Sequence, residues 1–99
     1  MSYEPRYSAA ARADIERLFA FLVQKDINAA CDALEATDRA AEFLREFPFA
    51  CRKAGPQNPF LRELVISFGS NGYVPLFEID DETTVTVLAV RHQREEDYH

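Results

Sequence analysis

Apolar and polar positions follow a helical period over the first half of the chain. One predicted helical face carries four apolar side chains at the i, i+3, i+4, i+7 spacing: Ile15, Leu18, Phe19 and Leu22. Ser8 precedes this pattern and is suited to accept hydrogen bonds from the first free N–H groups of a helix. We therefore predict a helix over residues 8–24.

A second apolar stripe predicts another helix, from Ile27 or Asn28 to Phe47. The stripe consists of Ala30, Cys31, Leu34, Ala41 and Leu44. Pro48 cannot continue the hydrogen-bond ladder of a helix, so the helix ends before it. The many alanines favour a close approach of the two helices.

Short, β-branched runs elsewhere predict strands. Residues 3–7 predict a short opening strand at a sheet edge, because Pro5 lacks a backbone donor. Residues 48–60 hold three prolines and a glycine without any period, which predicts a loop. Three further strands are expected, joined by turns at 69–72 and 80–82; they cover 64–68 after Arg62, 73–79, and 84–91.

The last predicted strand is apolar on both sides. One side would carry Val85, Val87 and Ala89, and the other Thr84, Thr86, Leu88 and Val90. We expect it inside the sheet, with helices on one face and a second cover, which a partner could supply, on the other. Pro75 predicts a bulge or an unpaired edge in the preceding strand. The order β-α-α-β-β-β predicts one α+β domain over residues 1–99, a helical hairpin packed on a small, mainly antiparallel sheet.

Composition narrows the classes of function. The 99 residues carry a net charge of −6, which argues against non-specific binding to nucleic acid. Cys31 and Cys51 form no CxxC pair, so no structural metal and no cofactor are implied, and both are expected to be free thiols. No apolar run is long enough for a bilayer, and the start lacks the features of a signal peptide, so we expect a cytoplasmic protein.

Three segments together resemble the RelE/ParE family of toxins from bacterial type II toxin-antitoxin modules. They read RYSAAARADIERL, RELVISFGSNGYVPLFEID and VTVLAVRHQREEDY, and the last two are the more specific. The family's fold has the element order predicted above. The resemblance implies a toxin held inactive by an antitoxin whose carboxy-terminal segment wraps it. Released toxins of this family either cleave ribosome-bound messenger RNA or poison DNA gyrase.

The nuclease branch of the family needs cations that this sequence lacks. Alignment on the Gly-Tyr pair places that branch's two catalytic lysines at Val65 and Ser67, and its phosphate-binding arginine at Val74. Without these charges a dianionic phosphorane is not stabilised. The resemblance therefore favours the ParE-like branch: not an enzyme, neutralised by a ParD-like antitoxin, with gyrase as target. A ribosome-dependent endoribonuclease is the alternative, and a module member whose main property is complex formation is a third.

The hypothesis for target contact rests on the end of the last strand. It comprises Arg91, His92, Arg94 and Tyr98. Alternation at a strand end puts Arg91 on one face of the sheet and His92 on the other. The alternative is an ordinary solvated terminus, and His92 is also an acid/base candidate under the nuclease interpretation. Glu95, Glu96 and Asp97 are expected to be solvating residues, and His99 to be frayed.

The hypothesis for antitoxin contact covers nine positions. Phe21 and Val23 fall off the helical stripe, so they either form an exposed apolar patch that receives an antitoxin helix or widen the buried face. Arg62 either reaches an antitoxin carboxylate or caps its strand. The remaining positions lie in the proline-bounded loop, where a solubilising role is the alternative, and in the strands; they are Arg52, Lys53, Val65, Ser67, Val74 and Leu76.

Overall fold

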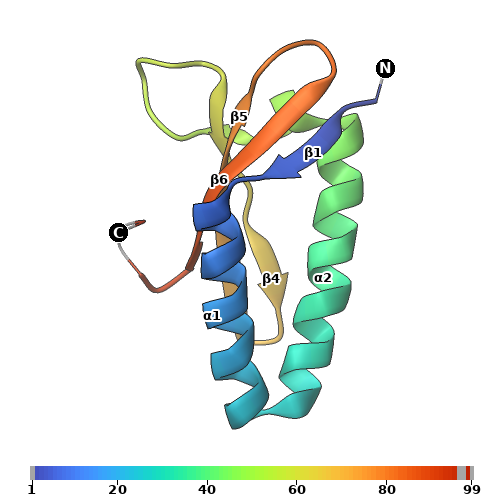
Figure 1. The fold of residues 1–99 in the computed structure, drawn as a ribbon, viewed down its shortest axis with the longest axis vertical. Helices are drawn as coiled ribbons and strands as arrows, with labels where there is room; N and C mark the ends of the chain where they lie inside the picture. Colours follow the sequence, from blue (N-terminus) through green and yellow to red (C-terminus); the bar gives the residue numbers. More distant parts are fainter. Residues whose placement is uncertain (1, 96–97, 99) are drawn as a thin grey trace.

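Two helices and a mixed sheet make up the computed structural model, which describes residues 2–95 and residue 98 (Figure 1). The elements in chain order are β1 (Glu4–Tyr7), α1 (Ala9–Lys25), α2 (Ile27–Glu46), the 3₁₀ helix η1 (Pro48–Ala50), β2 (Arg52–Lys53), β3 (Leu61–Glu63), β4 (Ile66–Phe68), β5 (Asn71–Ile79) and β6 (Thr84–His92). The predicted α+β class and the order of its main elements are confirmed.

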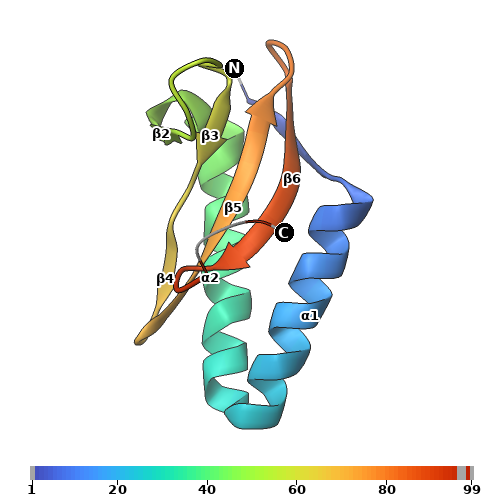
Figure 2. The ribbon, with the colours of Figure 1, turned by 90° about the vertical axis from the view of Figure 1, so that its left-hand side faces the viewer.

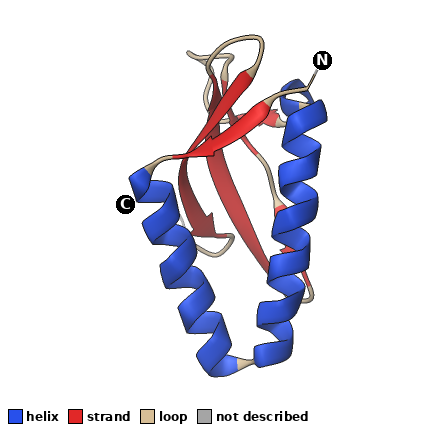
Figure 3. Cartoon of the chain, turned by 45° about the vertical axis from the view of Figure 1, so that its right-hand side comes forward, coloured by secondary structure: helices blue, strands red, loops and turns tan. Residues whose placement is uncertain are grey.

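The strands form one sheet in the order β1-β6-β5-β3-β2, and β4 pairs with β5 beyond the end of β3. β1 runs parallel to β6, whereas all other pairs are antiparallel. The strand β6 lies between β1 and β5, as its apolar character predicted, and β1 lies at an edge. Both helices pack on one face of the sheet (Figures 2 and 3).

Local capping sets the helix boundaries close to their predicted positions. Ser8 Oγ accepts a hydrogen bond from the Ala11 amide at 3.1 Å, and the predicted stripe of α1 faces the core. Asp26 then caps α2. The predicted stripe of α2 is wrong in part, since Cys31 is exposed and Leu34 is 53% exposed. Ala30 and Leu44 are buried as predicted, and the other buried positions of α2 are held by Ala33 and Ala36.

Two predicted segments differ in detail. The loop over 48–60 contains η1 and the two-residue strand β2. The single strand expected over 64–68 is interrupted, because Leu64 and Val65 separate β3 from β4 opposite Pro75. The Leu64 amide donates to the Pro75 carbonyl at 3.2 Å, but Pro75 has no N–H to donate in return. The irregular pairing expected at Pro75 is therefore observed in the strand opposite it, between β3 and β4.

A β-bulge at Leu88 changes the faces of β6. Leu76 pairs with Ala89 while Phe77 pairs with Val87, so Leu88 has no partner on β5. The predicted grouping of sides is therefore wrong beyond this point: Val90 joins Val85 and Val87 on the face toward the helices, where all three are buried. A bulge depends on cross-strand pairing and leaves no mark on simple alternation.

The core lies between the helices and this face of the sheet. Phe77, Val85 and Val87 are its most deeply buried large side chains. Within the described residues no helix covers the opposite face of the sheet, on which Glu63, Leu76 and Arg91 lie by register (Figure 2). Within the described residues neither helix has the length and hydrophobicity needed to cross a membrane.

Candidate functional site: the end of β6 and the surface of the helical hairpin

The end of β6 directs its two basic side chains to opposite faces of the sheet, as predicted. Arg91 is paired in register with Val74, on the face without helices. His92 is paired with Tyr73 on the helix side, and the centroids of the two rings are 6.5 Å apart. The predicted target-contacting residues therefore do not form one cluster.

Arg91 holds the turn that follows β6 in place. Its Nη1 donates to the carbonyls of His92 at 3.3 Å, Gln93 at 3.3 Å and Glu95 at 2.6 Å. Its side chain is only 14% exposed. A guanidinium committed to three main-chain acceptors fixes local geometry and is poorly placed to bind a target.

Glu63 anchors the same guanidinium and the residue Tyr98. Arg91 Nη2 lies 3.9 Å from Glu63 Oε2, and the Tyr98 hydroxyl donates to the same carboxylate oxygen. The Arg91 guanidinium also lies 5.3 Å from the centroid of the Tyr98 ring. Burial, and then the hydrogen bond to Glu63, raise the pKa of Tyr98. The phenol therefore stays protonated at neutral pH and cannot act there as a base.

His92 is held in one orientation by the turn. The Arg94 amide donates to its Nδ1 at 3.1 Å, which leaves the proton of the neutral ring on Nε2, 3.4 Å from Asn71 Oδ1. Burial, and then the positive charge of Arg94, lower the pKa of His92. Both effects favour the neutral form of the ring.

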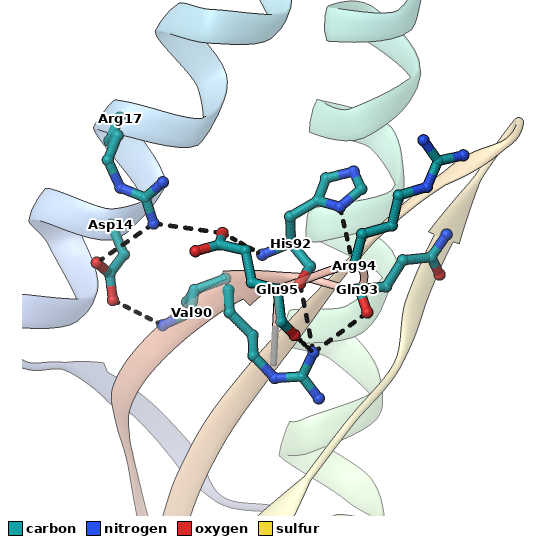
Figure 4. Close-up of polar contacts among 8 residues, drawn as sticks. Asp14, Arg17, Val90, His92, Gln93, Arg94 and Glu95 are labelled. Atoms are coloured by element: carbon teal, nitrogen blue, oxygen red, sulfur yellow. Dashed lines mark hydrogen bonds and ion pairs between the residues drawn. The ribbon is translucent and has the colours of Figure 1, made fainter. Parts of the chain in front are cut away.

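Glu95 connects this turn to α1. Its Oε1 accepts a hydrogen bond from the His92 amide at 2.9 Å and lies 3.6 Å from Arg17 Nη2. The same Arg17 nitrogen is 3.8 Å from Asp14 Oδ1, and Figure 4 shows the resulting chain of contacts. The prediction that Glu95 is merely solvating is therefore wrong. Glu96, Asp97 and His99 lie outside the described residues.

Arg94 is the remaining predicted target residue, and it differs from the others. It lies in the turn after β6 and is exposed. Within residues 2–95 and 98, Arg94 makes no ion pair. It is thus the cation of the predicted site that is most available to another molecule.

Phe21 and Val23 are exposed on α1, at 59% and 39%, so they do not widen the buried face. Two positions along a helix correspond to a rotation of roughly 200°, so the two side chains do not form one patch. Val23 continues the row of Ile15 and Phe19. Phe21 lies in the row of Arg17 on another side of the helix, and the Lys25 ammonium is 5.0 Å from its ring centroid.

An apolar cleft of about 190 Å³ lies between α1, α2 and the sheet. Its walls include Ile15, Phe19, Leu34, Leu44, Tyr73 and Val90. Leu34 contributes an exposed side chain here that the sequence pattern had placed in the core. Val23 follows Phe19 by one turn in the same row of α1.

The other predicted antitoxin positions divide by exposure. Arg62 donates to the carbonyls of Pro59 at 2.6 Å, Phe49 at 3.2 Å and Cys51 at 2.9 Å, so it holds the preceding loop as the capping alternative proposed. Exposed positions are Arg52, Lys53, Val65 and Ser67, while Leu76 is half-buried. Val74 is only 2% exposed.

The family comparison gives the class of the protein, a small toxin of a type II toxin-antitoxin system. The family model described as the ParE toxin of the parDE type II toxin-antitoxin system matches residues 6–97. The chain belongs to this family of ParE toxins. No curated protein matches the sequence significantly.

A solved structure has the same fold. The structure, titled "Chromosomal ParDE TA system from P. aeruginosa", aligns with a TM-score of 0.60 and 15% sequence identity. The alignment covers 90% of this chain and 94% of the other. At this identity the likeness supports the fold alone.

Proposed function

We propose that the free chain arrests growth in the cytoplasm by binding and inhibiting DNA gyrase, and that a ParD-like antitoxin neutralises it by tight binding. One observation supports gyrase rather than messenger RNA as the target. At the positions where the nuclease branch of the resemblance has its cations, this chain has Val65, Ser67 and Val74. Membership of the ParE family supports the toxin and its antitoxin in general terms.

The neighbouring groups do not replace the missing cations. Arg91, opposite Val74, is paired with Glu63 and with three carbonyls. The Tyr98 phenol has a raised pKa, and His92 has a lowered pKa and an Nδ1 that accepts a hydrogen bond from the Arg94 amide. Cleavage by the adjacent 2′-hydroxyl needs a base, an acid and charges to stabilise the phosphorane. A binding mechanism needs none of these groups.

Target contact in this proposal belongs to Arg94 and to the exposed edge of His92. Arg91 and Tyr98 act as positioning residues, because Arg91 Nη1 donates to main-chain carbonyls of the turn and the Tyr98 hydroxyl donates to Glu63. Replacing Arg94 by alanine should therefore reduce inhibition without unfolding the protein. Arg12, which is exposed on α1, provides the matched control.

The experiment that tests the target combines two assays on one sample. Purified chain is added to gyrase in a supercoiling assay and to a translating extract in which messages are mapped by primer extension. The proposal expects supercoiling to fall with unchanged chain and with Arg12→Ala, and to recover with Arg94→Ala. Cleavage of messages at codons in the ribosomal A site, with gyrase unaffected, would overturn it.

For the antitoxin, we propose that an amphipathic helix buries the cleft between α1 and α2 together with Val23, and that a second segment covers Phe21. The cleft is apolar and its wall residue Leu34 is exposed, which is the surface expected for a helix-in-groove contact. The gene beside this one is expected to encode a ribbon-helix-helix protein with such a tail.

Affinity for the protein encoded by that gene tests the proposed surface. Val23→Ser and Phe21→Ser should each weaken binding, by about tenfold for a buried apolar contact of about 1.4 kcal/mol. Ile27→Ser is the control, because Ile27 is as exposed as Phe21 and begins the other helix. Equal losses of affinity for all three variants would show that the antitoxin does not bind specifically at Val23 and Phe21.

A further inference from the structure

The described sheet has three strands with a neighbour on one side only: β1, β2 and β4. Natural edge strands usually carry proline or charge, which prevents pairing with another chain. β1 contains Pro5, and β2 consists of two cationic residues. β4 has neither kind of protection, since its sequence is ISF and the exposed Val65 precedes it.

The backbone of β4 presents unpaired groups along its outer side. Leu64 donates its amide to Pro75, so its polar groups face β5. In an antiparallel pair the direction of these groups alternates along the strand, so the N–H and C=O groups of Val65 and Ser67 face away from β5. Both residues are exposed. The edge therefore offers two donors and two acceptors in the geometry of a sheet.

A groove of about 200 Å³ runs along this edge, between β4 and α2. From α2 it is lined by Ala36, Arg39, Ala40 and Phe43, and from the sheet by residues 64–67. The alanines leave room for a backbone and small side chains, while Phe43 and Val65 add partly exposed apolar surface. Arg39 makes no ion pair with any residue in the described part of the chain, so its positive charge is available.

We propose that this β4 groove binds an extended segment of a partner protein, which adds to the sheet as a strand antiparallel or parallel to β4. Main-chain hydrogen bonds to Val65 and Ser67 hold the segment. Its alternate side chains point toward α2, where apolar residues contact Phe43 and the alanines and a carboxylate pairs with Arg39. The recognised chemistry is thus a β-strand with apolar residues on one side and an acidic residue among them.

The same observations argue against a second copy of this chain as the molecule that binds in the β4 groove. Two-fold pairing of β4 with itself would bring the two α2 helices to the same junction and place the two Arg39 charges near each other. The chain itself offers no carboxylate in the strand ISF. A partner strand with an acidic residue satisfies both the hydrogen bonds and the charge.

The test uses the full chain, labelled with ¹⁵N, and a capped heptapeptide as the probe. The peptide has threonine at odd positions, valine at the second and sixth, and glutamate at the fourth; a control peptide has lysine in place of glutamate. We expect amide shifts within residues 36–43 and 64–68. Hydrogen exchange of the Val65 and Ser67 amides should slow roughly tenfold at saturation.

Reversing the charge of Arg39 distinguishes a specific contact from non-specific peptide binding. Arg39→Glu should weaken binding of the glutamate peptide about fivefold and strengthen binding of the lysine peptide. Arg12→Glu, on the other helix, should change neither. Absence of shifts at millimolar peptide, shifts confined to the cleft between the helices, or protection of Val65 and Ser67 that rises with protein concentration without peptide would each overturn the proposal.

Discussion

Asp14 accepts a hydrogen bond from the backbone amide of Val90, with 2.9 Å between Oδ2 and the amide nitrogen, although the residues are 76 positions apart. Val90 lies opposite Pro75 on β5, two residues beyond the bulge at Leu88, and the pairing of β6 with β1 ends at Val87. Ser8 completes the arrangement, because its hydroxyl donates to the Leu88 carbonyl at 3.0 Å. The start of α1 thus supplies partners for polar groups of the bulge and fixes the helix against β6.

Replacement of Asp14 by alanine should therefore destabilise the protein by about 1–3 kcal/mol, because the buried Val90 amide would lose its acceptor. Asp14→Asn keeps an acceptor oxygen and should retain most of that free energy. The measurement is urea denaturation of the chain without antitoxin, since a bound partner would add its own stabilisation. As a control, Glu35→Ala on the exposed side of α2 should change the free energy of unfolding by less than about 0.5 kcal/mol.

The contrast between the helices and β6 explains what the sequence could predict. The cap at Ser8 and the stripe of α1 are local, and both were predictable from residues within a few turns. The Leu88 carbonyl at the bulge and the nearby Val90 amide find their partners in Ser8 and Asp14 from the far end of the chain, so no local pattern reveals the bulge. The same reason applies to Glu63, which no motif marked and which joins Arg91 to Tyr98.

Exposure was harder to predict than secondary structure. Leu34 fits the apolar period of α2 but lines the cleft between the helices and the sheet, where its side chain is 53% exposed. Val74 was assigned to a binding surface and is buried. Burial depends on which elements pack over a residue, and the hydrophobicity of the residue alone does not determine that.

Truncation of Phe77 should reduce the free energy of unfolding more than truncation of any other side chain. Phe77 is fully buried where β5 faces the helices, so Phe77→Ala should reduce the free energy of unfolding by about 3–5 kcal/mol. The half-exposed Phe60 is the matched control, and Phe60→Ala should cost no more than about 1 kcal/mol. Similar losses for the two variants would mean that the described packing of β5 is wrong.

His92 should make stability depend on pH. Its folded-state pKa lies below the ordinary value of 6.5, mainly because of burial, so the unfolded chain binds a proton at a higher pH than the folded chain does. The stabilisation that neutral His92 contributes is therefore fully present above the pKa of the unfolded state. It is lost as the pH falls through 6.5 toward the pKa of the folded state. Between about pH 7.0 and 5.5, His92→Gln should show a smaller loss of stability than the unchanged chain. Parallel pH profiles for the two proteins would exclude this role.

The two cysteines should differ strongly in their reaction with a thiol reagent. Cys31 is exposed on α2, whereas Cys51 is buried and burial raises its pKa to about 11. The thiolate is the reacting species, so Cys51 has both a low thiolate fraction and restricted access at pH 8. Native Cys51→Ser protein, which keeps Cys31, should react at least about tenfold faster than native Cys31→Ser protein. In urea above the unfolding transition the two variants should react at similar rates, because the difference arises from the fold. Rapid modification of Cys51 in the native protein would show that the segment between η1 and β2 opens more readily than its contacts with Arg62 imply.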